Sequence, residues 1–87
     1  MYLKLNRRHS LKYYEDEGFR ELVLSRVDKP RKQLSLSLNN CYQVIDVSHL
    51  GNVHTLTLSW CQNLIDVSQL GNVHTLNLTN CRNIKPV

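Results

Sequence analysis

No apolar run in this sequence approaches the roughly 18 residues that a membrane-spanning helix needs. The chain starts with MYLKLNRRHSLKYYEDEGF, which is too charged for the apolar region of a secretory signal peptide. The sequence contains only three cysteines, and this small, odd number argues against the disulfide framework of a small secreted domain. These absences predict an intracellular, cytoplasmic protein that makes no membrane contact.

Net positive charge is concentrated at one end of the chain. Residues 1–32 hold nine Lys and Arg against five acidic residues, a net charge of +4, whereas residues 33–87 hold two of each. A basic segment can attract nucleic acid or an acidic partner. Acidic residues at 15–17 and 21 interrupt the basic ones, and no nucleic-acid-binding motif accompanies them, so a solvated face is favoured. Nucleic-acid binding stays open as the weaker alternative. It would use Arg7, Arg8, Lys29, Arg31 and Lys32.

A repeat dominates the rest of the sequence. The stretch IDVSHLGNVHTLTL (45–58) returns as IDVSQLGNVHTLNL (65–78), twenty residues later and with two of fourteen positions changed. The same step of twenty relates cysteines and leucines in three copies: Cys41, Cys61 and Cys81; Leu36, Leu56 and Leu76; Leu38, Leu58 and Leu78. A fixed period over three copies predicts a solenoid, because each unit presents the same faces to its neighbours.

One unit contains the pattern Val53-x-x-Leu56-x-Leu58-x-x-Cys61, which matches the signature L-x-x-L-x-L-x-x-N/C. The sequence therefore resembles the leucine-rich repeat family in a short, cysteine-containing form, over most of residues 33–85. This resemblance implies an α/β solenoid. Short parallel β-strands would form its concave face, and 3-10, short-helical or irregular turns would form its convex face.

The resemblance also implies a domain organisation and an origin. Residues 33–87 are expected to form regular twenty-residue repeats, the last one truncated, and residues 1–32 to form irregular N-terminal repeats or a cap. The phrase DVSxLGNVHTLxL is similar to leucine-rich repeat proteins encoded by large amoeba-infecting DNA viruses. That similarity implies a viral protein in the host cytoplasm or the virion.

Each half of the unit has its own physical signals. Leu56 and Leu58 alternate with small polar residues, the period-two pattern of a half-buried strand with its leucines in the core. Asp66 before VSQL predicts an N-cap on a single helical turn. Gly71 and Asn72 are predicted to supply a residue with φ > 0, so that the chain can enter the next strand. The opposite wall of the core is expected to consist of Leu64, Ile65, Val67 and Leu70.

The N-terminal third carries weaker copies of the pattern. The tripeptides LKL (3–5) and LVL (22–24) repeat L-x-L and, together with the three regular copies, predict five parallel strands. The stretch SLKYYEDEGF (10–19) predicts a short helix ended by Gly18, and DKPRK (28–32) predicts a tight polar loop.

Neither the cysteines nor the histidines point to catalysis. The cysteines form a column with Cα atoms about 5 Å apart if the strands stack normally. No C-x₂₋₄-C pair accompanies them, so inert, reduced core thiols are favoured over a disulfide or a zinc site. His54 and His74 occupy identical contexts, and packing is favoured over titration. A non-enzymatic protein without metal or cofactor is expected.

The outward side chains of the concave face are the candidate binding site. Trp60 is the only Trp, and it interrupts the repeat at the end of its strand. Exposed aromatics often anchor protein partners, although packing over a neighbouring repeat is an equally open interpretation. Leucine-rich repeats typically bind proteins through this face, so the resemblance implies a protein–protein interaction module whose partner is unknown. The candidate residues are Ser37, Asn39, Thr55, Thr57, Ser59, Trp60, Thr75, Asn77 and Thr79.

The last repeat suggests another use. The sequence stops before the DVSxLG half of this unit, and an exposed strand edge invites pairing with another chain. Self-association through the C-terminal edge, in a structural or assembly role, is therefore an alternative function. A third alternative is a substrate adaptor for ubiquitin ligation, because cysteine-containing repeats resemble those of F-box proteins. The 87 residues contain no F-box segment, which counts against it.

Overall fold

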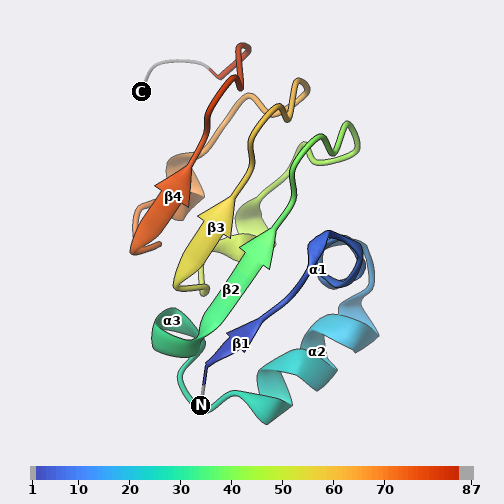
Figure 1. Cartoon of the computed structure of the whole chain (residues 1–87), viewed down its shortest axis with the longest axis vertical. Helices are drawn as coiled ribbons and strands as arrows, with labels where there is room; N and C mark the ends of the chain where they lie inside the picture. The colour runs from blue at the N-terminus through green and yellow to red at the C-terminus, as the bar shows by residue number, and fades with distance from the viewer. Residues whose placement is uncertain (1, 85–87) are drawn as a thin grey trace.

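The structure is a computed structural model that describes residues 2–84 (Figure 1). Its elements are β1 Leu3–Lys4, α1 Arg7–Glu15, α2 Glu17–Arg26, α3 Pro30–Gln33, β2 Leu34–Ser37, η1 Ser48–Leu50, β3 Thr55–Thr57, η2 Ser68–Leu70 and β4 Thr75–Asn77. The strands form one sheet in the order β1-β2-β3-β4, and each neighbouring pair is parallel. Helices α1 and α2 lie beside the β1 end of the sheet, and the 3-10 turns η1 and η2 lie behind the strands (Figure 1).

The twenty-residue period of the sequence is also the register of the sheet. Leu36 lies opposite Leu56, and Leu56 lies opposite Leu76. The core leucines of β2 and β3 are at most 1 % exposed, which confirms the predicted inward face. The chain is a small α/β protein with short helices and an all-parallel sheet, an architecture compatible with a solenoid. We name the repeated units the β2 rung (34–53), the β3 rung (54–73) and the β4 rung (74–84).

The wall of the core opposite the strands has a period of three. From residue 41 to the end of the β2 rung, buried side chains recur at every third position, namely Cys41, Val44, Val47, Leu50 and Val53. Tight turns with about three residues per turn bring every third side chain to the same side. Leu64 and Leu70 are buried as predicted, but the prediction for Ile65 is wrong, because this side chain is 41 % exposed.

The two aspartates of the repeat stabilise the turns that precede the 3-10 helices. The carboxylate of Asp66 accepts a hydrogen bond from the N–H of Ser68 at 2.9 Å, and that of Asp46 from Ser48 at 3.0 Å. These bonds lower the pKa of both carboxyl groups. The predicted carboxylate-to-backbone contact is therefore present, although the residue in the N-cap position of η2 is Val67.

The position of the left-handed residue differs from the sequence-based expectation. Gly71 has φ −61° and Gly51 has φ −71°, so neither glycine adopts the left-handed conformation. In the described residues, positive φ angles occur three positions after the last residue of β2, β3 and β4, at Asn40, Trp60 and Asn80. The prediction of φ > 0 at Gly71-Asn72 is wrong, because the left-handed residue lies in the turn after each strand and not in the turn before the next one.

A fifth strand at 22–24 is also a wrong prediction, because these residues lie in α2. The carboxylate of Asp16 accepts a hydrogen bond from the N–H of Phe19 at 3.1 Å and caps this helix. Leu22 is 51 % exposed, whereas Val23 is 6 % exposed. The helical spacing of four residues therefore determines what is buried here. The inward positions are Phe19, Val23 and Val27.

Helix α1 begins and ends earlier than the short helix predicted over 10–19. Asn6 caps it by accepting a hydrogen bond from the N–H of His9 at 2.8 Å, and Asp16 is its C-cap. Gly18 lies in the first turn of α2 and does not end α1. The predicted loop at 28–32 contains the start of α3, whose first residue is Pro30.

Side chains of α1 attach the N-terminal section to the β2 rung. The Tyr14 hydroxyl accepts hydrogen bonds from the N–H groups of Ile45 at 3.0 Å and Asp46 at 3.1 Å. The buried Ser10 hydroxyl accepts one from the N–H of Ser37 at 2.8 Å. Tyr13 is fully buried. None of the helices in residues 2–84 is long and apolar enough to cross a membrane.

Candidate functional site: the polar sheet face

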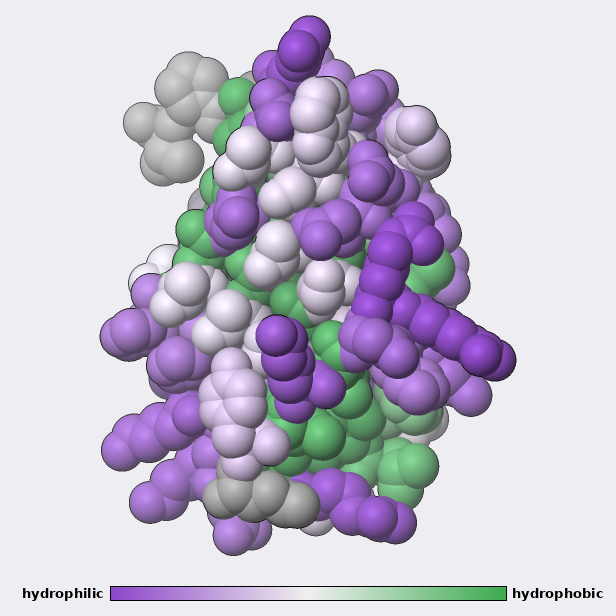
Figure 2. All heavy atoms as spheres, viewed as in Figure 1, coloured by the Kyte–Doolittle hydropathy of each residue, from purple (hydrophilic) through white to green (hydrophobic). Residues whose placement is uncertain are grey.

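The side chains that alternate with the core leucines gather on one surface of the sheet. The register aligns Ser37, Thr57 and Asn77 across β2, β3 and β4. Small, pale-coloured side chains occupy the middle of the molecule in the view over these strands (Figure 2). We call this surface the polar face. Its members are Ser37, Asn39, Thr55, Thr57, Ser59, Thr75, Asn77 and Thr79, all uncharged.

Exposure on the polar face increases toward β4. The side chains of its β4 rung are exposed, and those of the β2 and β3 rungs are half-buried. Tyr2 covers the start of β2, where Ser35 is only 5 % exposed. Hydrogen bonding to the side chains of Ser35 and Thr55 lowers the pKa of Tyr2. Tyr2 therefore closes one corner of the face, and the residues from Thr57 to β4 stay accessible.

Hydrogen bonds within the polar face leave Thr57 free. Asn39 donates through Nδ2 to the Oγ of Ser37 at 3.3 Å. Asn77 accepts the backbone N–H of Thr79 through Oδ1 at 2.9 Å. Within residues 2–84, the Thr57 hydroxyl has no hydrogen-bond partner, so it can both donate to and accept from an external group.

Trp60 follows β3 at the edge of the polar face. Its backbone has φ 64°, and its N–H donates to the carbonyl oxygen of Thr79 at 2.9 Å. The side chain is 42 % exposed, so it does not pack fully over the neighbouring rung. At the equivalent positions the other rungs have Asn40 and Asn80, with φ angles of 60° and 61°. Asn tolerates this conformation far better than a bulky residue does.

The basic residues considered for nucleic-acid binding do not form one patch. Arg7 donates to the carbonyl oxygens of Asn39 at 2.6 Å and Asn40 at 3.2 Å, beyond the C-terminal end of β2. Lys29, Arg31 and Lys32 lie at the opposite end of β2, where α3 precedes the strand.

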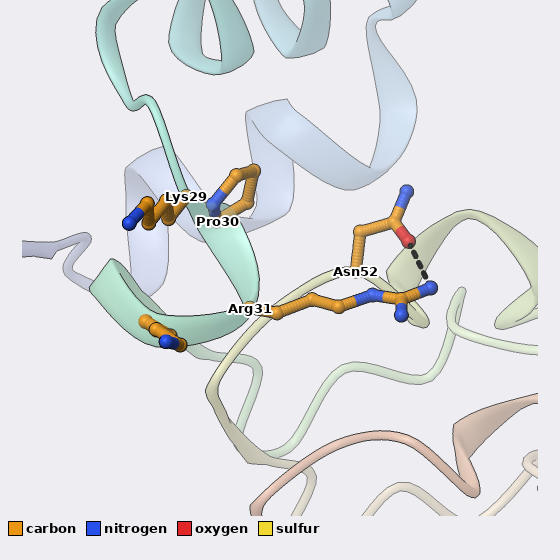
Figure 3. A pocket seen from close by; sticks show the side chains of 5 residues that line it. Lys29, Pro30, Arg31 and Asn52 are labelled. Carbon is orange, nitrogen blue, oxygen red and sulfur yellow. Dashed lines mark hydrogen bonds between the residues drawn. The ribbon is translucent and has the colours of Figure 1, made fainter.

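The basic residues of α3 surround a surface hollow. Its volume is about 570 Å³, and its lining residues include Lys29, Pro30 and Asn52 (Figure 3). Arg31 donates to the Oδ1 of Asn52 at 3.4 Å. The guanidinium group thus contacts the turn of the β2 rung, which gives Arg31 a structural contact at this end of the strand.

The cysteines form a column inside the core, behind the polar face. Cys41 and Cys61 are fully buried, Cys81 is partly buried, and all three are free thiols. Cys61 donates to the carbonyl oxygen of Leu38 at 3.0 Å, and Cys81 to that of Leu58 at 2.7 Å. Burial raises the pKa of Cys41, and that of Cys61 to about 11. The thiols of Cys41 and Cys61 therefore stay protonated at neutral pH.

The histidines form a second column at the start of the strands. The rings of His54 and His74 are stacked, with centroids 4.6 Å apart and an angle of 12° between planes. Their Nδ1 atoms lie 2.8 Å and 3.0 Å from the hydroxyl oxygens of Thr55 and Thr75. Each ring is thus held by its own rung. In the described residues, no group of three or more His, Cys, Asp or Glu could hold a metal ion.

One repeated contact was not predicted from the sequence. Asn63 donates through Nδ2 to the carbonyl oxygen of Tyr42 at 2.9 Å, and Asn83 to that of Gln62 at 2.6 Å. The shared step of twenty between the two asparagines was the available signal. These bonds connect the loops that follow the cysteines of neighbouring rungs.

Comparison of the chain with family models, with curated proteins and with solved structures finds no match. Its function must therefore be inferred from its own residues and geometry.

Proposed function

We propose that the chain is a leucine-rich repeat module that binds another protein through the polar face and catalyses no reaction. The observation that carries this proposal is Trp60, which combines a φ of 64° with a side chain that is 42 % exposed. A left-handed backbone costs about 1–2 kcal/mol for a residue with a Cβ atom. Because strained residues concentrate at functional sites, a large aromatic group in this position supports a binding role.

The rest of the polar face has the chemistry of a neutral, hydrogen-bonding surface. Its hydroxyl groups can donate and accept, and Thr57 has no partner within the described residues. A protein partner would enclose the indole of Trp60 in an apolar pocket and form hydrogen bonds from uncharged polar groups to Thr57 and Asn77. Lys4 of β1 lies in register beside Ser35 and is the charged neighbour of the polar face. The members of the polar face itself are uncharged, so binding through Thr57 and Asn77 should depend little on salt concentration.

The two positions that vary in the duplicated stretch support this assignment. Thr57 and Asn77 are aligned on the polar face, and His49 and Gln69 are exposed on the turns behind the strands. The positions that do not vary include the buried leucines and the turn aspartates, which build each rung. Side chains that differ on an accessible face are the ones able to determine partner specificity.

The remaining reactive side chains support a non-enzymatic role. Burial raises the pKa of Cys61 to about 11, which disfavours the thiolate needed for nucleophilic attack. The Nδ1 atoms of His54 and His74 are within hydrogen-bond distance of threonine hydroxyls, and their rings pack against each other. Each of these groups already has a structural partner.

Capture of binding proteins on the immobilised chain tests the proposal. Trp60→Asn and the double variant Thr57→Lys with Asn77→Lys should each lose the captured proteins, because the first removes the aromatic group at the edge of the polar face and the second alters the accessible part of the face itself. Gln69→Lys is the matched control, since it adds the same charge on the exposed turn behind the sheet. Equal capture by the wild type and both polar-face variants would refute the proposal.

A further inference from the structure

The two copies of the duplicated stretch, residues 45–58 and 65–78, already pack against each other inside this molecule. Residues 45–58 contain η1 and β3, and residues 65–78 contain η2 and β4. Strand β4 pairs with β3 in register, and η2 packs against η1. Residues 65–78 therefore pack against the nearly identical residues 45–58. Because the two segments are so similar, the outer side of residues 65–78 presents almost the same surface that residues 45–58 present to them.

Two glycines show which part of this surface is still open. A Cβ atom on Gly51 would lie 2.9 Å from the carbonyl oxygen of Gln69, so the turn of the β3 rung occupies the space above Gly51. A Cβ atom on Gly71 would meet nothing within 4 Å in the part of the chain that the structure describes. The space beside Gly71 is thus open, whereas the corresponding space beside Gly51 is occupied by a backbone carbonyl group.

The strand side of the surface is open in the same way. The backbone N–H of Thr75 donates to the carbonyl oxygen of His54 at 3.0 Å, and the carbonyl oxygen of Asn77 accepts a hydrogen bond from the N–H of Leu58 at 2.8 Å. In a parallel sheet alternate residues bond to opposite neighbours, so the backbone groups of Leu76 and Leu78 point away from β3. Val53, Leu56 and Leu58 are fully buried, whereas their counterparts in the next copy are partly exposed. Those counterparts are Val73, Leu76 and Leu78.

We propose that the outer surface of residues 65–78 is a docking site for a further copy of the same fourteen-residue stretch, carried by another polypeptide. The bound stretch would place a turn carbonyl over Gly71, form a parallel strand beside β4 and cover Leu76 and Leu78. The argument is one of continuity, because this interface repeats the contact between residues 45–58 and 65–78 that the molecule already makes.

A second folded copy of this protein fits the surface less well. In each copy, residues 45–58 are covered by residues 65–78. The inner side of residues 65–78 is occupied by the same contact, and α2 lies beside β1 at the far end of the sheet (Figure 1). A second copy would therefore have to open its own sheet before it could provide a matching stretch.

The test titrates a synthetic peptide with the sequence of residues 65–78 into isotope-labelled protein, up to about 1 mM, and follows the amide resonances. The expected result is a set of shift changes at Gly71, Leu76 and Leu78. Gly71→Ala should weaken binding at least about tenfold, because the new methyl group occupies the space of the docked carbonyl. This variant should leave the rest of the free protein's spectrum unchanged, since the space is open.

Two controls separate this surface from others. A peptide whose two strand leucines are replaced by Asp should not bind, and Trp60→Asn should bind the original peptide normally, because the polar face is not involved. Three results would overturn the proposal: no shift changes at these residues, equal affinity for Gly71→Ala, or self-association of the protein alone through β4 that is insensitive to Gly71→Ala.

Discussion

The thiol of Cys61 donates a hydrogen bond to the carbonyl oxygen of Leu38 at 3.0 Å, inside the core. Burial raises the pKa of this thiol from 9.0 to about 11. The protonated thiol is therefore favoured by folding, so its contribution to stability is complete below pH 9.0 and is lost as the pH rises toward about 11.

We predict that the urea midpoint of the wild type falls between pH 9.0 and about pH 11. Cys61→Ser keeps a hydrogen-bond donor but has no thiol to titrate, so its midpoint should fall less steeply over the same range. A decline of equal slope in both proteins would contradict a buried, protonated Cys61.

Substitution of the two glycines should have unequal effects on stability. Gly51→Ala should lower the free energy of unfolding by about 1–3 kcal/mol, because the methyl group would meet the backbone of Gln69 at 2.9 Å. Gly71→Ala should change it by less than about 0.5 kcal/mol or raise it slightly, because φ is −61° and the space is open. Urea denaturation of the two variants provides the comparison, and equal losses would show that the rungs are not stacked in this register.

A helix and a strand at residues 22–24 predict opposite effects of substitutions at Leu22 and Val23 on stability. Val23→Ala should lower the free energy of unfolding by about 1–3 kcal/mol, because Val23 is 6 % exposed. Leu22→Glu should change it by less than about 0.5 kcal/mol, because Leu22 is 51 % exposed. In a strand the two leucines would face the core, and urea denaturation would give the reverse order.

Relief of backbone strain should make Trp60→Asn more stable than the wild type. Asn occupies the same left-handed position in the neighbouring rungs, at residues 40 and 80. The expected gain is about 1 kcal/mol in the free energy of unfolding, measured with urea. Trp60→Phe, which keeps a bulky residue at φ 64°, is the control and should show no such gain. A loss of stability in Trp60→Asn would mean that packing of the indole outweighs the strain.

The sequence was informative where identical units must bury identical side chains. The step of twenty between Leu36, Leu56 and Leu76 predicted three parallel strands and their register, and alternation predicted the outward residues of the polar face. The corner covered by Tyr2 was not predictable, because it depends on where a segment distant in sequence is placed.

Two errors came from local patterns that fit more than one conformation. The L-x-L at 22–24 suits a strand, but the cap at Asp16 and the four-residue spacing from Phe19 to Val27 favour a helix, and burial of Val23 follows from it. Glycine is the usual residue at φ > 0, and for this reason the left-handed residue was predicted at Gly71-Asn72. The recurring asparagines after the strands were the better signal.

The most direct test of the proposed function is an amide and indole resonance map of the labelled protein bound to a captured partner. The account predicts that the largest changes occur at the indole N–H of Trp60 and at the amides of Thr57 and Asn77, with little change at Gln69. Changes concentrated on the turns behind the sheet, with Trp60 unaffected, would contradict it.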